Sequence, residues 1–231
     1  SQDPFFKKMK SILTVHNLAY QGLFPKEKFP RLNLEKKLFS PDYLEFYDQI
    51  NFLKGGIVLS DLVTTVSQTY AKEIQTGQFG CGLDGVLKQR KKTVVGILNG
   101  LDYKIWDPAT DHFIHCNYSA ATPDDKKPNK KYLQEQYKLP VKEDVPLLGF
   151  VGRLSHQKGL DLFSQSVSAI MKMDVQIALF GVGESKYHKM LTELAARYPD
   201  KIAVCLEFNE KKAHQIYAGC DGFLMPSTYE P

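Results

Sequence analysis

Residues 146–163 read PLLGFVGRLSHQKGLDLF, and this stretch decides the fold. An apolar run of strand length, 146–151, is followed by a short polar loop and then by helical spacing of apolar residues. The apolar residues that share one face of this helix are Leu160, Phe163, Val167 and Ile170. The stretch therefore predicts a strand, a loop and an amphipathic helix.

The loop of this unit carries two cations, Arg153 and Lys158, beside the start of the helix. Free N–H groups and the helix dipole favour negative charge at such a point. Arg153 offers a planar fork that suits phosphate oxygens, and Lys158 offers a compact point charge. We interpret the loop as an anion site, and two solvated surface charges are the alternative.

The same strand–loop–helix pattern recurs through the C-terminal half. Apolar runs that predict strands occupy 175–180, 201–208 and 221–226, and helical segments occupy 187–198 and 210–219. Alternation with short links indicates a parallel sheet that is buried on both faces. Right-handed crossovers place the strand-to-helix loops at one edge, where ligands of such sheets bind. We therefore expect one pocket wall to contain Arg153, Lys158, Gly183, Phe208 and Glu230.

The N-terminal half shows a weaker version of this layout. Strand-like runs that end in polar residues occupy 11–17, 62–68 and 93–100, and a helical segment is expected around 43–59. His16, Ser67 and Asn99 follow the three strand ends, again at one edge. The segment 117–131, NYSAATPDDKKPNKK, is predicted to be a linker.

The fold class that follows is α/β, with two Rossmann-like domains whose ligand edges face a cleft. The predicted boundaries are 1–103 for the N-terminal domain, 104–140 for a hinge and linker, and 141–231 for the C-terminal domain.

The composition and net charge argue against two classes of protein, nucleic-acid-binding proteins and membrane-spanning proteins. Of 231 residues, 43% are hydrophobic and 24% are charged, as in ordinary globular proteins, and the net charge of +4 is too small to indicate nucleic-acid binding. No apolar run approaches 18 residues, so we expect no membrane span. The four cysteines form no CxxC pair, which predicts free, mostly buried thiols in a reducing compartment, the cytoplasm or an organelle interior.

We predict no metal and no cofactor. The sequence has no DxD motif, and His112 and His115 in HFIH have no acidic or thiol companions nearby. Two cations can neutralise a diphosphate leaving group without a metal. The lysine-rich stretches 88–92 and 126–131 are predicted to be solvated surface rather than binding patches.

The remaining candidate residues are each ambiguous in isolation. Gly181 and Gly183 permit close backbone approach to a ligand, or simply make a turn. Phe208 can stack on a nucleobase or belong to a core. The other ambiguous polar candidates, each with an ordinary structural or solvated alternative, are His16, Asn99, Asp102 and Glu230.

Taken together, the motifs resemble the bacterial glycogen synthase and plant starch synthase family. The matching segments, in family order, are TVHNLAYQGLF (14–24), INFLKGGIVLSDLVTTVS (50–67), TYAKEI (69–74), FGCGLDGVL (79–87), GILNGLDYKIWDP (96–108), VGRLSHQKGLDL (151–162) and MPSTYEP (225–231). HNLAYQG and ILNGxDxxxWxP are more specific than the Arg/Lys loop. The resemblance implies a retaining glycosyltransferase of the GT-B type that extends an α-1,4-glucan from ADP-glucose.

The resemblance also implies roles for single residues. Arg153 and Lys158 match the pair that binds the donor diphosphate, and Glu230 matches a glutamate that contacts sugar hydroxyls. His16 and Asn99 match residues that contact the glucosyl unit. Phe208 stands where relatives stack an aromatic ring on adenine, Gly181 and Gly183 match a loop near the nucleotide, and Asp102 belongs to the same motif as Asn99. The implied partners are ADP-glucose or ADP and an α-glucan acceptor.

The departures from the family pattern predict an internal fragment in which both domains are incomplete. The resemblance implies that 1–103 is the second part of an acceptor-side domain and that 141–231 is the first part of a nucleotide-sugar-binding domain. The lysine-glycine-glycine loop expected before HNLAYQG and the Cys-Gly-Leu expected after Glu230 are missing from this sequence. We therefore expect this piece alone to be inactive, and its unpaired sheet edges to favour association with another chain. The implied location is the bacterial cytoplasm, or the plastid stroma in a plant.

Two alternatives stay open beside this function. One is another GT-B glycosyltransferase, such as a sucrose or trehalose-phosphate synthase, against which HNLAYQG argues. The other is a non-catalytic nucleotide- or glucan-binding module of the same fold. The sequence does not fix ADP over UDP, because Phe208 would stack on either base, and it leaves the oligomeric state open.

Overall fold

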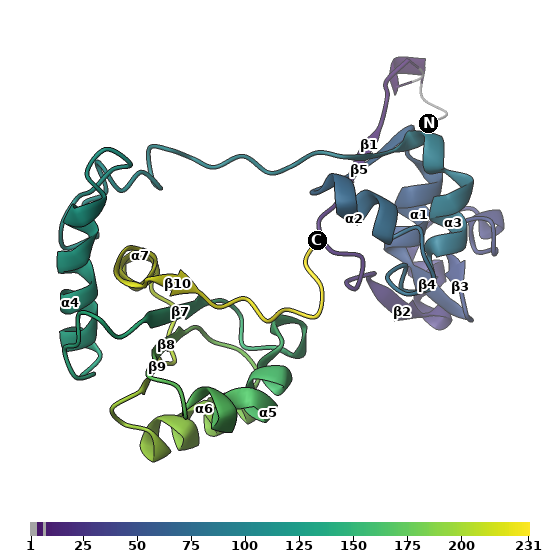
Figure 1. Ribbon diagram of the computed structural model, residues 1–231. Coiled ribbons are helices and arrows are strands. Elements are labelled where there is room, and N and C mark those ends of the chain that lie inside the picture. The colour runs from purple at the N-terminus through teal and green to yellow at the C-terminus, as the bar shows by residue number, and fades with distance from the viewer. Residues whose placement is uncertain (1–3, 7) are drawn as a thin grey trace. The chain divides into compact units, whose positions relative to one another are not determined.

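The computed structural model describes residues 4–6 and 8–231, and its elements are labelled in Figure 1. The chain divides into two compact units. The first contains the residues up to Gly100 together with Pro231, and the second is Leu101–Glu230. No helix in the described part of the chain is long and apolar enough to cross a membrane.

A parallel sheet forms the centre of the first unit. Its strands, in spatial order, are β1 (Ile12–Val15), β5 (Leu62–Thr65) and β6 (Val94–Gly96). The helices of this unit are α1 (Phe52–Leu59), α2 (Gln68–Glu73) and α3 (Asp84–Gln89). Val15 and Val63 from the sheet pack against Ile57, Ile74 and Leu87 in a buried core. The three strands were expected from their apolar runs.

The helix expected over 43–59 begins only at Phe52. Before it, β3 (Glu45–Phe46) and β4 (Gln49–Asn51) form an antiparallel hairpin, and β4 also pairs with β2 (Leu23–Pro25). The two residues between β3 and β4, Tyr47 and Asp48, have φ of 47° and 62°, which matches a tight hairpin turn. Asn51 then caps α1 by accepting a hydrogen bond from the Lys54 N–H at 2.9 Å. The prediction was wrong for 43–51.

The second unit has a four-stranded parallel sheet in the order β10-β7-β8-β9. The strands are β7 (Leu147–Val151), β8 (Gln176–Phe180), β9 (Ile202–Cys205) and β10 (Gly222–Phe223). The helices are α4 (Lys127–Gln136), α5 (Leu160–Ile170), α6 (Ser185–Arg197) and α7 (Glu210–Gly219). The chain runs outward from β7 through β8 to β9 and then crosses back through α7 to place β10 on the other side of β7, as in Rossmann-like folds.

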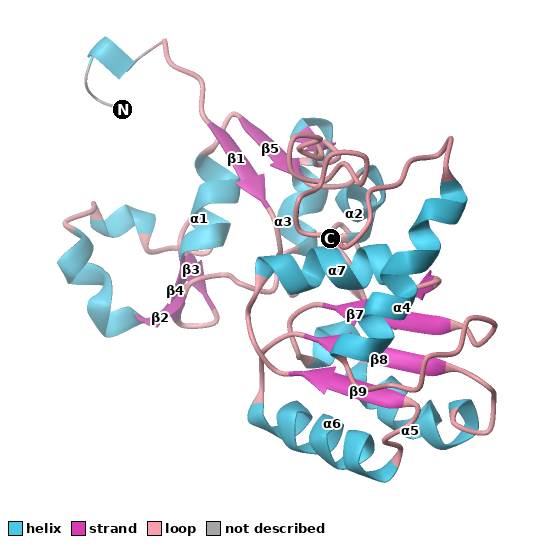
Figure 2. Ribbon diagram, turned by 90° about the vertical axis from the view of Figure 1, so that its left-hand side faces the viewer, coloured by secondary structure: helices cyan, strands magenta, loops and turns pink. Residues whose placement is uncertain are grey.

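Helices cover both faces of this sheet. Ile177 and Leu179 of β8 pack with α5 and α6, whereas Ala178 and Phe180 pack with α4 and α7. Figure 2 shows these two helix pairs on opposite sides of β7, β8 and β9. The alternation along β8 is the period-2 pattern of a strand that is buried on both faces. The predicted core face of α5 is confirmed, since Leu160, Phe163 and Val167 are buried.

Helix α4 lies where the sequence predicts a linker. The prediction over 117–131 is wrong for its last residues, because α4 begins at Lys127 after a 3-10 turn, Pro123–Lys126. Three of the four residues that α4 buries are polar, namely Asn129, Lys130 and Gln134. These side chains form hydrogen bonds with the backbone or with buried polar groups. Because polar residues occupy the buried face, α4 lacks the apolar periodicity by which a helix is predicted from sequence.

The four cysteines are all free. Only Cys220 is buried, and Cys81 is exposed, so the prediction of mostly buried thiols is wrong. Burial raises the pKa of the Cys220 thiol above its usual range. This thiol is therefore inert at neutral pH.

Candidate functional site

A pocket of about 590 Å³ lies at the carboxyl edge of the second unit's sheet. It is lined by the last residues of β7 and β8, by the loops that follow β7, β8 and β9, by the first turns of α7 and by one residue from the segment before α4. The lining residues are Trp106, Val151, Gly152, Arg153, Phe180, Gly181, Val182, Glu207, Phe208, Asn209, Glu210 and Ala213. This is the edge at which open α/β sheets bind their ligands.

Arg153 and Lys158 follow β7, and the structure brings both to this edge. Arg153 is exposed and lines the pocket. Lys158 ends the 3-10 turn His156–Lys158, and its Cε lies 3.9 Å from the position that a Cβ on Gly152 would occupy. The pocket therefore has a guanidinium in its wall and an ammonium-bearing side chain beside it, which suits a multiply charged anion.

Gly159 makes the turn after Lys158 possible. It has φ of 69°, and a Cβ there would lie 1.8 Å from the carbonyl oxygen of Pro226. The terminal segment thus packs directly against the main chain of the loop. Thr228 adds a backbone hydrogen bond to the Gln157 carbonyl at 2.9 Å. These contacts bring Glu230 to the loop that carries Lys158.

Lys158 and Glu230 form an ion pair with 2.7 Å between Nζ and Oε1. Both side chains are partly exposed. The hydroxyl of Ser227 donates a second hydrogen bond to the same Glu230 oxygen, at 2.5 Å. Glu230 is therefore held in place by two donors, and its second oxygen is available to accept from a ligand hydroxyl.

Gly181 and Gly183 follow β8 and have no room for a side chain. A Cβ on Gly181, where φ is 150°, would lie 1.8 Å from the carbonyl oxygen of Gly152, and one on Gly183 would lie 2.1 Å from that of Leu154. Leu154 and Gly183 also form a parallel bridge beyond the ends of β7 and β8. The main chains of the two loops that border the pocket are thus in direct contact and are paired by this bridge.

Phe208 follows β9 and is 89% exposed while it lines the pocket. The core alternative for this residue is therefore wrong. Its neighbours are fixed: Asn209 caps α7 by accepting from the Lys212 N–H at 3.1 Å, and Lys212 pairs with Glu207 at 2.9 Å. The Glu207 carboxylate, through this bond, raises the pKa of Lys212. An exposed ring on a well-anchored loop can stack on a planar ligand.

Trp106 is a pocket residue to which sequence reasoning assigned no role. It belongs to GLDYKIWDP, a segment that precedes α4. Its indole stacks on the His214 ring of α7, with 3.8 Å between ring centroids and 9° between planes. Its residue type could have identified it in the sequence, because it is the single tryptophan of the chain. Tyr103, three residues earlier, is exposed in the structure.

The first unit holds two further candidates, at the carboxyl edge of its own sheet. His16 follows β1 and Asn99 follows β6, and both are exposed. Ser67, which follows β5, is used as the cap of α2 and accepts from the Tyr70 N–H at 3.1 Å. Gln21 is buried and accepts a hydrogen bond from the Asn51 amide, so it supports the fold rather than a ligand.

Asp102 belongs to the second unit, unlike Asn99 of the same motif. Its side chain accepts a hydrogen bond from the Lys104 N–H at 2.9 Å, which makes a local turn. The structure therefore brings Lys158 and Glu230 together at the loop after β7, which also carries Arg153. Of the five residues expected in one pocket wall, Arg153 and Phe208 line the pocket, whereas Lys158, Gly183 and Glu230 are not in its lining. His16 and Asn99 lie in the other unit.

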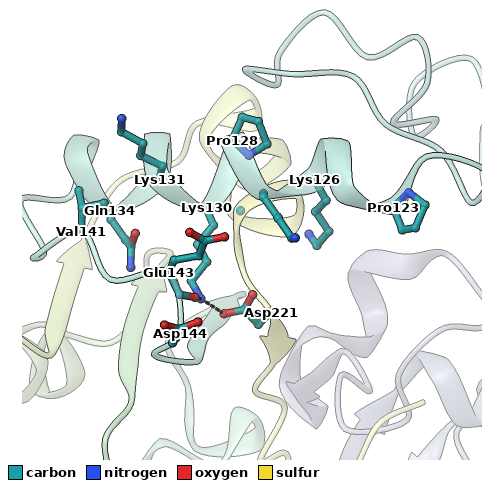
Figure 3. Close-up of a pocket in the computed structure, with 12 residues that line it drawn as sticks. Pro123, Lys126, Pro128, Lys130, Lys131, Gln134, Val141, Glu143, Asp144 and Asp221 are labelled. Atoms are coloured by element: carbon teal, nitrogen blue, oxygen red, sulfur yellow. Dashed lines mark hydrogen bonds and ion pairs between the residues drawn. The ribbon is translucent and has the colours of Figure 1, made fainter.

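A second cavity, of about 620 Å³, lies beside α4 and is drawn in Figure 3. Of its four lysines, Lys130 pairs with Asp221 at 2.7 Å, and Lys126 donates to the carbonyls of Tyr217 and Ala218. Asp221 accepts from the N–H of Leu147, the first residue of β7. This cavity is therefore at the amino edge of the sheet, away from the ligand edge, and Lys126 and Lys130 stabilise the fold.

Within residues 4–6 and 8–231, no group of three His, Cys, Asp or Glu side chains gathers in a way that could hold a metal ion. His112 and His115 have aromatic neighbours instead. His112 packs on Phe113, and His115 stacks on Tyr132 with 4.6 Å between centroids.

Comparison with known proteins agrees with this architecture. The family model described as the starch synthase catalytic domain matches residues 1–89, and the one described as glycosyl transferases group 1 matches residues 133–231. The catalytic domain of starch synthase IV from Arabidopsis thaliana, solved with ADP and acarbose, superposes with a TM-score of 0.89 at 33% identity. That superposition covers 96% of this chain and 47% of the plant chain.

Two curated bacterial proteins are more similar in sequence. Glycogen synthase from Geotalea daltonii is 49% identical, and glycogen synthase 2 from Nitrosococcus oceani is 48% identical. Each match covers 99% of this chain and 47% of the relative. The chain thus spans about half the length of the curated relatives that it matches.

The α/β units and these matches define the GT-B type of fold that glycosyltransferases share. Within this class, the chain belongs to the family of bacterial glycogen synthases and plant starch synthases. The family and fold class expected from the motifs are confirmed.

Proposed function

We propose that this chain serves the transfer of glucose from ADP-glucose to the non-reducing end of an α-1,4-glucan, with retention of configuration, in glycogen or starch synthesis. The observation that carries the proposal is the placement of Arg153 and Lys158 at the switch point after β7, around a pocket of about 590 Å³. Two cations at that point match the charge of a nucleoside diphosphate.

The chemistry proposed for these cations is stabilisation of the leaving group. As the glucosyl bond breaks, negative charge grows on the diphosphate, and fixed positive groups lower the energy of that charge in a site from which water is excluded. Retention is explained by attack from the face that the diphosphate leaves, with the departing phosphate accepting the proton of the acceptor hydroxyl.

The remaining candidates have binding roles in this proposal. Glu230 accepts hydrogen bonds from sugar hydroxyls with the oxygen that faces neither Lys158 nor Ser227. Phe208 stacks on the base, and the main chain at Gly181 and Gly183 lies against the nucleotide. His16 and Asn99 of the first, acceptor-side unit contact the glucosyl group, and Asp102 supports the turn beyond Asn99.

The proposed partners are ADP-glucose or ADP and an α-glucan. The solved plant relative that carries ADP and acarbose supports both classes of ligand. We place the protein in the bacterial cytoplasm, or in a plastid stroma in a plant, in keeping with its four free thiols and its bacterial relatives.

The first test is calorimetric titration of this chain with ADP, with UDP as the comparison. Saturable binding of ADP that Lys158→Ala weakens supports the nucleotide site. Glucosyl transfer is tested in a chimera in which this chain replaces the matching half of the Geotalea daltonii enzyme. Incorporation of labelled glucose from ADP-glucose into glycogen is expected, and a folded chimera that binds ADP without transferring glucose would contradict the proposed reaction.

A further inference from the structure

Trp106 has an exposed aromatic surface at the pocket. The side chain lines the cavity of about 590 Å³ and is 39% exposed, although the segment that carries it is remote in sequence from β7, β8 and β9. Phe208 is the other exposed aromatic residue in that lining, because Phe180 is buried. The pocket thus offers two aromatic rings, and Arg153 provides positive charge in a lining that also contains Glu207, which pairs with Lys212, and Glu210.

Helix α7 holds the indole from one side. The His214 ring lies parallel to it at 3.8 Å, and the Tyr217 ring meets it edge-on at 5.7 Å. His214 and Tyr217 are three residues apart and so lie on one face of α7. The first turns of the same helix contribute Glu210 and Ala213 to the pocket. The position of the indole is therefore tied to the helix that borders the pocket.

His214 is held in turn by a buried carboxylate. Its Nδ1 lies 2.6 Å from Oδ2 of Asp111, and both side chains are almost fully buried. The second oxygen of Asp111 accepts from the Phe113 N–H at 2.8 Å, and the Phe113 ring meets the imidazole edge-on. These contacts fix both the plane and the in-plane rotation of the imidazole, and hence the surface on which the indole lies.

This arrangement is costly for the fold. The other ring nitrogen of His214, Nε2, is buried and has no hydrogen-bond partner among the described residues. Burying an acidic side chain and an imidazole with one nitrogen unsatisfied is unfavourable compared with an apolar contact. An apolar residue at 214 could pack against Trp106, but it could not be locked in rotation by Asp111. The arrangement therefore favours precise orientation over stability.

We propose that Trp106 contacts the nucleoside portion of a nucleoside diphosphate in this pocket, and that His214 and Asp111 are positioning residues that hold its indole at the required angle. For the identity of the ligand, the inference rests on the proposed function. Arg153 then receives the diphosphate, while the indole and Phe208 supply aromatic surface to the nucleoside. Asp111 and His214 influence the affinity for the nucleoside diphosphate only by orienting Trp106.

The single tryptophan makes the first experiment direct, because all indole emission comes from Trp106. ADP is titrated into the unmodified chain, and emission and calorimetric heat are recorded in parallel. The expected result is a saturable change in emission with the dissociation constant that calorimetry gives. Calorimetric binding with unchanged emission would overturn this inference and leave the proposed function standing. The absence of any binding would overturn both.

Variants then separate contact from positioning. Trp106→Leu is expected to raise the dissociation constant for ADP about tenfold, and Trp106→Phe to raise it less, because a ring is kept. Asp111→Asn is expected to raise it severalfold and to shift the emission of the free protein. Combined with Trp106→Leu, it should add nothing further, because it acts through the indole. Full additivity in this cycle would show a merely structural role.

Tyr132→Leu provides the matched control. Tyr132 stacks on His115 in the same unit, yet neither residue lines the pocket. Its replacement should leave ADP affinity and the emission response unchanged, and an equal loss of affinity would overturn the specific role of Trp106. Circular dichroism verifies that each variant folds. Should Asp111→Asn fail to fold, His214→Gln, which keeps a donor for Asp111 and removes the stacked ring, takes its place.

Discussion

Lys158 and Glu230 form an ion pair with 2.7 Å between Nζ and Oε1, although 72 residues separate them in sequence. The pair connects the loop after β7 with the terminal segment of the second unit. It also means that the lysine proposed to meet a diphosphate already has a carboxylate partner. A bound diphosphate and Glu230 therefore compete for the same ammonium group.

This competition predicts the effect of Glu230→Gln on nucleotide affinity. The substitution keeps the shape and removes the negative charge, so ADP should bind about threefold more tightly to this chain, in line with a partly exposed ion pair worth up to about 1 kcal/mol. Calorimetric titration at two salt concentrations is the measurement. Weaker binding would show that Glu230 orients Lys158 toward the ligand instead of competing with it.

Lys158→Ala should have the opposite effect. Loss of a charge-assisted hydrogen bond to phosphate is expected to raise the dissociation constant for ADP about tenfold or more, since such bonds contribute roughly 1.5–3 kcal/mol. Lys131→Ala is the control, because Lys131 is an exposed lysine of the same unit beside the other cavity. Equal affinities for the two variants would remove Lys158 from the site.

Gly183→Ala should destabilise the second unit. The added methyl would lie 2.1 Å from the Leu154 carbonyl oxygen, and the two loops can separate only by breaking their bridge. We expect a loss of more than about 1 kcal/mol and a lower melting temperature. Gly85→Ala in α3 is the comparison: nothing lies within 4 Å of its added Cβ, so helix propensity should raise stability slightly. A Gly183→Ala protein that melts like the parent would contradict the steric argument.

Asp61 predicts a pH dependence of stability in the first unit. It accepts hydrogen bonds from the N–H and hydroxyl of Ser11 and from Lys10, and these donors lower its pKa to about 2. A carboxyl group with a lowered pKa stabilises the fold above its unfolded pKa, about 3.9, and this contribution disappears as the pH falls toward 2. Asp61→Asn should therefore lower the melting temperature at pH 7. The difference from the parent should shrink by pH 3, and a constant difference would contradict the linkage.

The sequence predicts the sheet of the second unit well because apolar residues make up most of each strand there. β8 is the clearest example, since Ile177 and Leu179 serve one face and Ala178 and Phe180 the other. The segments that sequence reasoning placed wrongly have weak local signals. The hairpin of β3 and β4 depends on positive φ at Tyr47 and Asp48. A positive φ is readily predicted from the sequence at glycine or asparagine, but not at a residue such as tyrosine.

The candidate site was predictable where it follows strand ends. Arg153, Gly181 and Phe208 line the pocket because the chain order of a parallel sheet places their loops at one edge. Trp106 was missed because nothing local connects it with that edge. Its place depends on a stacked contact with His214, 108 positions along the numbering, and on the buried bond to Asp111. Such contacts result from tertiary packing and produce no periodic pattern in the sequence.

The glycines of the ligand edge limit how the site can change during evolution. At Gly159, Gly181 and Gly183 the opposing surface is a backbone carbonyl, which every amino acid carries, so no compensating substitution on the other side can make room for a side chain. Divergence of ligand preference within this architecture is therefore confined to positions whose side chains project from the fixed frame, such as Phe208 and Trp106. Under the proposed function, descendants of this fold can change which nucleoside they prefer far more readily than they can change where its phosphates lie.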